Sequence, residues 1–286
     1  MKKIKIHLAL LGIISTLLTI GCNNTNKNVE SEIAFLGNEI IDSAITIHLQ
    51  FANFALNDQN NTGLVMVLAN PSDSLGALEI IPVNNNLNIE ILKSYKQLFN
   101  EYSVTSEKDL KDSKASFSNL VVSTCILIDS ASKEYKATTE PLMANVMSVK
   151  INQTEFLLQM TQLLLSIYKN DLLNWQMQLN ENFSKFQKKL LATPAESFDE
   201  EKLAKFIYQP YSGKRIMVQV YKQSLIEEVY LRNSTFYQQN QNLILCMESL
   251  QFAMSEYLKK QSDKVIVNQY LDKVKLNLNL PLTIKE

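Results

Sequence analysis

Few residues in this chain have the types and spacing that catalysis requires. Histidine occurs twice, at His7 and His48. So few imidazoles cannot build a His-based zinc site or the facial triad of a non-haem iron enzyme, and no Glu-x-x-His pair is present for a di-iron bundle. His48 has the right type for a lone catalytic base, but it follows Ile47 on an amphipathic stretch. We therefore expect a partly exposed structural histidine.

Neighbouring carboxylates, which could do acid–base work, do not converge on one cleft. The adjacent pairs Glu227-Glu228 and Glu200-Glu201 face different directions on a helix. Asp109 and Asp112 share a face, but the lysines at 108, 111 and 114 make that face a solvated stripe. The chain also has no Gly-rich phosphate loop, no Gly-x-Ser-x-Gly elbow and no Cys-x-x-Cys pair. We therefore expect no catalytic residue, no metal site and no cofactor, and a protein that is not an enzyme.

Aromatic side chains gather in one third of the chain. They are Tyr208, Tyr211, Tyr221, Tyr230, Phe236 and Tyr237. Such rings can line a ligand groove, but aromatics at helical spacing more often form core. We favour the core interpretation.

The first residues predict export. Lys2, Lys3 and Lys5 make a basic start, and an apolar stretch follows from Leu8 to Ile20. That stretch is too short to cross a bilayer comfortably, and it has the length of the hydrophobic region of a secretory signal peptide.

The end of the apolar stretch reads Leu18-Thr19-Ile20-Gly21-Cys22 and is followed by polar, Asn-rich residues. It resembles the lipobox of bacterial lipoproteins, in which a small residue precedes a cysteine. It departs from the usual pattern in one respect, since Thr19 stands where the box usually has Leu. The resemblance implies cleavage before Cys22, a diacylglycerol on its thiol and usually an acyl group such as palmitate on its amine. The alternative is an ordinary signal peptide or an uncleaved anchor.

The resemblance also implies a cellular location and a domain organisation. Residues 1–21 would be the signal peptide, 22–30 the lipidated cysteine with a polar tether, and 31–286 a helical-bundle domain. The protein would be lipid-anchored in the cell envelope. Because Asn23 rather than Asp follows the cysteine, it would lie in the outer membrane of a Gram-negative host, and otherwise on the outer face of the cell membrane.

Charge excludes one class of partner. Without residues 1–21, which hold three lysines and no acid, 25 basic side chains face 29 acidic ones, a net charge of −4. This balance lacks the basic footprint of a nucleic-acid-binding protein. The partners we expect are the membrane, through lipid on Cys22, and another protein.

Glycine and proline are scarce, with six of each in 286 residues, so the many tight turns of a sheet-rich domain are absent. Apolar residues instead recur every three or four positions. We expect helices from near Ser31, from Leu87, from Ser106 to about Tyr135, over 142–192 after a start at Pro141, over 214–261 and over 263–277. Ser197 and Glu200 suggest a capping box that opens a short helix to about Tyr208.

The expected fold is all-α: an elongated up-and-down bundle of long helices with one irregular apolar segment at about 63–86. That segment could form a small β-hairpin or a packed loop. The longest seam runs from Met160 to Leu190 and includes Trp175, which we expect to be buried.

Two thiols remain besides Cys22. Cys125 lies between Val121 and Ile128, and Cys246 between Leu243 and Leu250, each on or beside an apolar seam. Export would permit a disulfide between them, but free cysteine is among the most buried residue types. We favour two separate buried thiols.

The sequence thus favours a membrane-anchored lipoprotein that acts without catalysis through protein contacts, in an accessory, assembly or scaffold role. The alternative is a membrane-active or ligand-carrying bundle. Such a bundle is similar only in outline to helical pore-forming toxins.

Lipidation makes the first prediction. Cells grown with a clickable fatty acid should label the wild-type protein and not Cys22→Ser, because the thiol carries the diacylglycerol. Labelling is read from a gel of the immunoprecipitated chain, and equal labelling of the two proteins would contradict the prediction.

Overall fold

The computed structural model describes residues 29–56, 67–69, 87–103, 110–148, 152–207, 213–259 and 264–278. Helices account for 92% of these residues. Among them the one β pairing is an isolated antiparallel bridge between Leu68 and Phe198. The all-α helical bundle expected from the sequence is confirmed.

Eight α-helices are present in the described part of the chain. They are α2 (Val29–Leu56), α4 (Ile89–Ser103), α5 (Leu110–Ala131), α6 (Lys136–Ser148), α7 (Gln153–Ala192), α8 (Glu200–Leu203), α9 (Lys214–Leu258) and α10 (Lys264–Leu278). Two 3₁₀ turns, η3 (Lys133–Tyr135) and η4 (Ala195–Ser197), precede α6 and α8. At 1.5 Å per residue, α7 and α9 are about 60 and 67 Å long.

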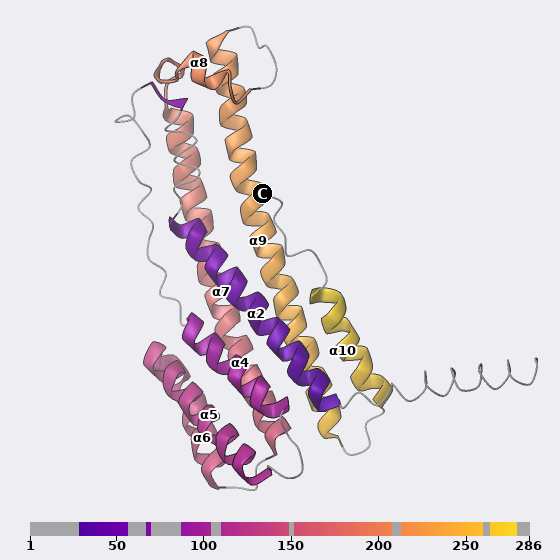
Figure 1. The fold of residues 1–286 in the computed structure, drawn as a ribbon. Coiled ribbons are helices and arrows are strands. Elements are labelled where there is room, and N and C mark those ends of the chain that lie inside the picture. Colours follow the sequence, from indigo (N-terminus) through magenta and orange to yellow (C-terminus); the bar gives the residue numbers. More distant parts are fainter. Residues whose placement is uncertain are drawn as a thin grey trace, which may run out of the picture.

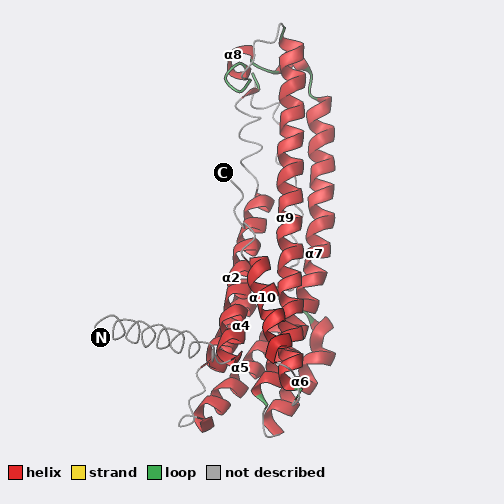
Figure 2. Ribbon diagram, turned by 90° about the vertical axis from the view of Figure 1, so that its right-hand side faces the viewer, coloured by secondary structure: helices red, strands yellow, loops and turns green. Residues whose placement is uncertain are grey.

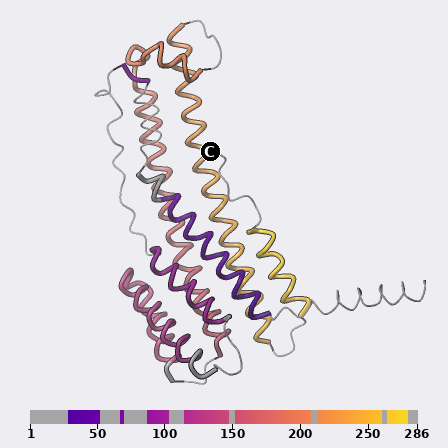
Figure 3. The backbone as a smooth tube through the Cα atoms, viewed as in Figure 1, coloured from indigo at the N-terminus to yellow at the C-terminus, as the bar shows by residue number. Residues whose placement is uncertain are grey.

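The molecule is elongated because α7 and α9 extend well beyond the ends of the helices that pack on them (Figures 1 and 2). Around their lower halves α2, α4, α5, α6 and α10 complete a bundle, which we call the body. Beyond the end of α2, α7 and α9 are the described helices that continue side by side to η4 and α8, and α9 then returns along the whole length of the described molecule (Figure 3). We call this extension, residues 176–207 and 213–235 together with 67–69, the arm.

The predicted helix seams form the core of the body. The described members of the α2 seam from Ile33 to Phe51 are all buried. The α4 seam (Ile91, Tyr95, Leu98, Tyr102) and the α5 seam (Phe117, Val121, Cys125, Ile128) join the same hydrophobic cluster. Gly37 lets α2 approach α4 closely, because a Cβ there would clash with the ring of Phe99.

An aromatic group sits where the body meets the arm. Trp175 on α7 is fully buried and stacks on Phe51 of α2, with ring centroids 4.8 Å apart. Phe236 of α9 lies 5.9 Å from the same indole and Tyr168 6.0 Å from it. These rings join three helices at one level, and the prediction that Trp175 is buried is confirmed.

Three buried polar side chains of the body, those of Tyr168, Asp171 and Asn240, form hydrogen bonds that link separate parts of the chain. Tyr168 Oη donates to Asn240 Oδ1 over 2.5 Å, and Asn240 Nδ2 donates to the carbonyl of Phe236. The fully buried Asp171 accepts the backbone N–H of Leu87 at 2.7 Å. This bond fixes the entry of α4, whose first turn is capped by Asn88 through its Oδ1.

A second, smaller hydrophobic cluster closes the arm at its tip. It contains Val67 and Leu68, which the chain brings there from between α2 and α4, with Phe198 and Leu203 of the tip and side chains of α7 and α9. Backbone bonds from Ala69 N to Ser197 O and from Asp199 N to Val67 O hold the segment in place. This arrangement pairs part of the irregular segment 63–86 with the tip; the rest of that segment lies outside the described residues.

The prediction of one helix over 142–192 with Pro141 at its start is wrong. α6 begins at Lys136, directly after η3, so Pro141 lies inside it. Pro141 and Ala137 are exposed, so water can reach the carbonyl that loses its helical N–H. The next helix, α7, starts after Asn152, which is extended and accepts the N–H of Glu155. A side-chain cap separates the two helices without any glycine or proline.

Two other predicted boundaries are also wrong. The cap of α8 is Asp199 rather than Ser197: its Oδ1 accepts the N–H groups of Glu201 and Lys202 at 3.0 and 3.1 Å. The bond from Lys202 is the largest cause that lowers the pKa of Asp199. α8 ends at Leu203, and Tyr208 lies outside the described residues. α5 ends at Ala131 because Ser132 is extended and caps η3, while Ser106 lies outside the described residues.

In the part of the chain that the structure describes, no helix combines the length and hydrophobicity needed to cross a bilayer.

Trp175→Ala should lower the free energy of unfolding by about 3–5 kcal/mol, because it opens a cavity between three helices. Met177→Ala on the same helix is the matched control, since Met177 is 64% exposed; it should change stability by about 0.5 kcal/mol or less. Urea unfolding followed by circular dichroism measures both. Equal losses in the two variants would show that Trp175 does not hold the helices together.

Candidate binding site

The predicted lipidation residue, Cys22, lies outside the described residues together with the rest of 1–28. The described chain begins with α2 at Val29, and the first turn of this helix is bonded to the body. Tyr257 Oη donates to Glu30 Oε1 at 2.9 Å, and Lys275 pairs with Glu32 at 2.5 Å. The chain therefore enters the body beside the end of α9 and one face of α10.

His48 is half-buried and lies edge-on to Trp175, with ring centroids 5.9 Å apart. Burial lowers its pKa, which favours the neutral imidazole that packs against the indole. Its Nδ1 has no hydrogen-bond partner among the described residues. The partial exposure expected for His48 is confirmed, and its ring packs against the core.

The two cysteines of the bundle do not meet. Cys125 and Cys246 are both buried and free, so the prediction of separate thiols is confirmed. Cys125 Sγ lies 3.9 Å from Met160 Sδ, whereas Cys246 Sγ faces the carbonyl of Val274 on α10. Burial raises the pKa of each thiol to about 12, so both stay protonated and weakly nucleophilic at neutral pH.

The acidic residues do not gather into a centre either. Among the described residues no group of three His, Cys, Asp or Glu side chains is placed to hold a metal ion. Glu227 and Glu228 are both exposed on α9, and Glu200 and Glu201 are both exposed on α8. Asp109 lies outside the described residues, and the side chain of Asp112 is not described.

The aromatic cluster of the C-terminal third divides into two kinds of residue. Tyr221 and Phe236 are buried, as a core interpretation requires, but Tyr230 is 61% exposed and Tyr237 only half-buried. Phe236, Tyr230 and Tyr237 line one pocket. The groove interpretation therefore holds for part of the cluster, while Tyr208 and Tyr211 lie outside the described residues.

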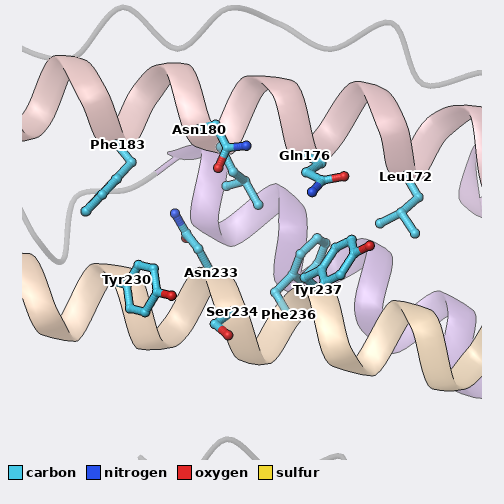
Figure 4. Close-up of a pocket in the computed structure, with 10 residues that line it drawn as sticks. Leu172, Gln176, Asn180, Phe183, Tyr230, Asn233, Ser234, Phe236 and Tyr237 are labelled. Atoms are coloured by element: carbon cyan, nitrogen blue, oxygen red, sulfur yellow. The ribbon is translucent and has the colours of Figure 1, made fainter.

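This pocket lies at the root of the arm, between α7 and α9, and has a volume of about 190 Å³ (Figure 4). One wall comes from α7 and the other from α9, with α2 passing behind. The lining residues are Leu172, Gln176, Leu179, Asn180 and Phe183 of α7 and Tyr230, Asn233, Ser234, Phe236 and Tyr237 of α9. None carries a formal charge at neutral pH.

The sequence places these residues together by helical spacing. Leu172, Gln176 and Phe183 lie four and seven residues apart, which puts them on one face of α7. Tyr230, Asn233 and Tyr237 repeat the pattern on α9. Phe183 and Tyr230 then meet across the groove, with centroids 6.4 Å apart, and close the end that faces the tip.

Polar side chains around the pocket have unused hydrogen-bonding groups. The side chains of Gln176, Asn180, Asn233 and Ser234 make no hydrogen bond with other described residues, and the Asn233 oxygen is buried without a partner there. Seven residues along α9, Asn240 is fully paired with Tyr168 and Phe236. The pocket thus offers amide donors and acceptors beside ring faces.

A second depression, of about 440 Å³, lies between α6 and α7. It is lined by aliphatic and neutral polar residues that include Tyr135, whose hydroxyl already accepts a hydrogen bond from Asn170 at 2.9 Å. Because the arm pocket combines four aromatic rings with unpaired amides, it is the better candidate for a binding site.

Compared with protein-family models, curated protein sequences and solved structures, the chain has no significant match.

Thiol labelling checks the placement of the cysteines. With Cys22 lipidated or replaced by serine, maleimide should modify two thiols per chain after unfolding in guanidinium without reductant. In the native protein we expect labelling at least ~100-fold slower, because both thiols are buried and protonated. Two thiols that react at the unfolded rate in the native protein would mean that the helices around them are packed differently.

Proposed function

We propose that this protein is a lipid-anchored protein of the bacterial cell envelope that acts without catalysis, through protein contacts made by its arm. Lipid on Cys22 is the membrane attachment, and the role is that of an accessory, assembly or scaffold factor. The lipobox-like run that ends at Cys22 supports the attachment.

The separation of the two ends of the molecule supports the contact role most directly. Seven residue steps join Cys22 to Val29, and an extended chain of that length spans at most about 25 Å. The start of α2 therefore stays near the bilayer if Cys22 carries lipid. The tip with η4 and α8 lies at the opposite end of α9 (Figure 1), about 67 Å along that helix.

The tip also presents apolar side chains to its surroundings. Leu191, Phe206 and Ile216 are 58%, 51% and 47% exposed, beside the small cluster that closes the arm. Lone exposed apolar residues are ordinary on protein surfaces, but these three belong to consecutive elements of one tip. A surface of this kind, held far from the anchor by two rigid helices, suits contact with another envelope protein.

Site-specific photo-crosslinking in the native host tests the proposal. A benzophenone amino acid at Phe206 or Leu191 should give a discrete protein adduct, because these positions face the partner. The matched controls are Leu276 and Val265 on α10, which are exposed to a similar degree on the body. Adducts at the tip should weaken when Cys22→Ser removes the anchor. Adducts from α10 and none from the tip would contradict the proposal.

A further inference from the structure

We propose that the pocket at the root of the arm binds a single neutral sugar ring. This site is separate from the tip surface, and the inference does not depend on the lipid anchor or on the protein contacts proposed above.

The lining determines the charge of the ligand. No lysine, arginine, aspartate or glutamate contributes to the pocket. A charged group that entered it would lose water without gaining a counter-ion, which is costly. The ligand that the pocket accepts is therefore uncharged.

The pocket needs both apolar and polar partners. Phe183 and Tyr230 form one end, Phe236 and Tyr237 the other, and the amides of Asn180 and Asn233 face the space between them (Figure 4). A purely apolar ligand would leave these amides without partners. A sugar ring presents C–H groups to an aromatic face and hydroxyl groups at its edge, so it satisfies the rings and the amides together.

The unpaired side-chain oxygen of Asn233 also favours a ligand with hydroxyl groups. Its side-chain oxygen is buried and accepts no hydrogen bond from the described residues, and Asn233 is the one residue with such an atom in the lining of this pocket. Rotation of the side-chain amide by 180° exchanges the positions of its oxygen and nitrogen, so either a donor or an acceptor can face the groove. Hydroxyl groups, which donate and accept, match such a residue.

Size limits the ligand to one ring. The pocket volume of about 190 Å³ is below the ~300–1,000 Å³ of sites for drug-sized ligands. An oligosaccharide would therefore place one residue in the pocket and the others outside, along the open groove between α7 and α9.

Saturation-transfer NMR on the purified full-length chain tests the inference, in a detergent whose headgroup carries no sugar. The probes are glucose, galactose and N-acetylglucosamine, with glucuronate as the anionic control and cyclohexanol as the apolar one. At least one neutral sugar should give transfer at millimolar concentration, more strongly than either control. Trp175, the single tryptophan, lies 5.9 Å from Phe236, so its fluorescence should change over the same concentrations.

Variants assign the signal to the pocket. Tyr230→Ala and Asn233→Leu should each weaken binding about tenfold, which corresponds to the loss of one good contact. Leu231→Ala, next to Tyr230 and equally exposed, should leave binding within twofold. Because Tyr230 is exposed, its variant should keep the wild-type melting temperature. No transfer from any neutral sugar, transfer that survives both pocket variants, or stronger binding of cyclohexanol or glucuronate would overturn the inference.

Discussion

The pairing of α7 with α9 is the constraint on which the rest of this structure depends. Both helices are long because neither contains glycine or proline, and Trp175 fixes their register against Phe236. The hydrogen bond between Tyr168 and Asn240, seven residues away on α7 and four residues away on α9, holds the two helices in the same register. α2 then adds Phe51 to the same aromatic group, so three helices are aligned by one buried indole. α10 and α4 pack on helices that this alignment has already positioned.

Because α7 and α9 run through both the body and the arm, the polarity of their facing residues changes along the length of the molecule. In the body, other helices cover α7 and α9, and polar residues such as Asn240 and Asp171 have protein partners. Beyond the end of α2 two helices alone cannot bury a broad apolar face, and their facing residues become Gln176, Asn180 and Asn233. The polar pocket thus lies near the end of α2. Towards the tip a second apolar core follows, built by α7 and α9 from about Phe186 and Val229 onward and completed by 67–69.

The sequence was sufficient for helices with regular apolar seams, such as α2 and α9, because heptad-like spacing indicates both and α9 also contains no glycine or proline. It failed where a single side chain decides a boundary. Asn152 and Asp199 are cap residues that look like ordinary polar residues in a helical run, whereas Pro141 looks like a helix start and lies inside α6. It also could not show that 67–69 pack on the tip, because Leu68 and Phe198 are 130 positions apart in the chain.

The sequence indicated some of the pocket residues but could not show that they form a pocket. Aromatic residues at 230, 236 and 237 were evident, and helical spacing favours core for such residues. Whether a ring becomes core or pocket wall depends on whether a neighbouring helix covers it, and the end of α2 decides that. Phe236 lies 5.6 Å from Phe51 between ring centroids and is buried, while Tyr230, nearly two turns towards the tip, packs against Phe183 and stays exposed. The same helix face therefore makes core on one side of this boundary and a binding surface on the other.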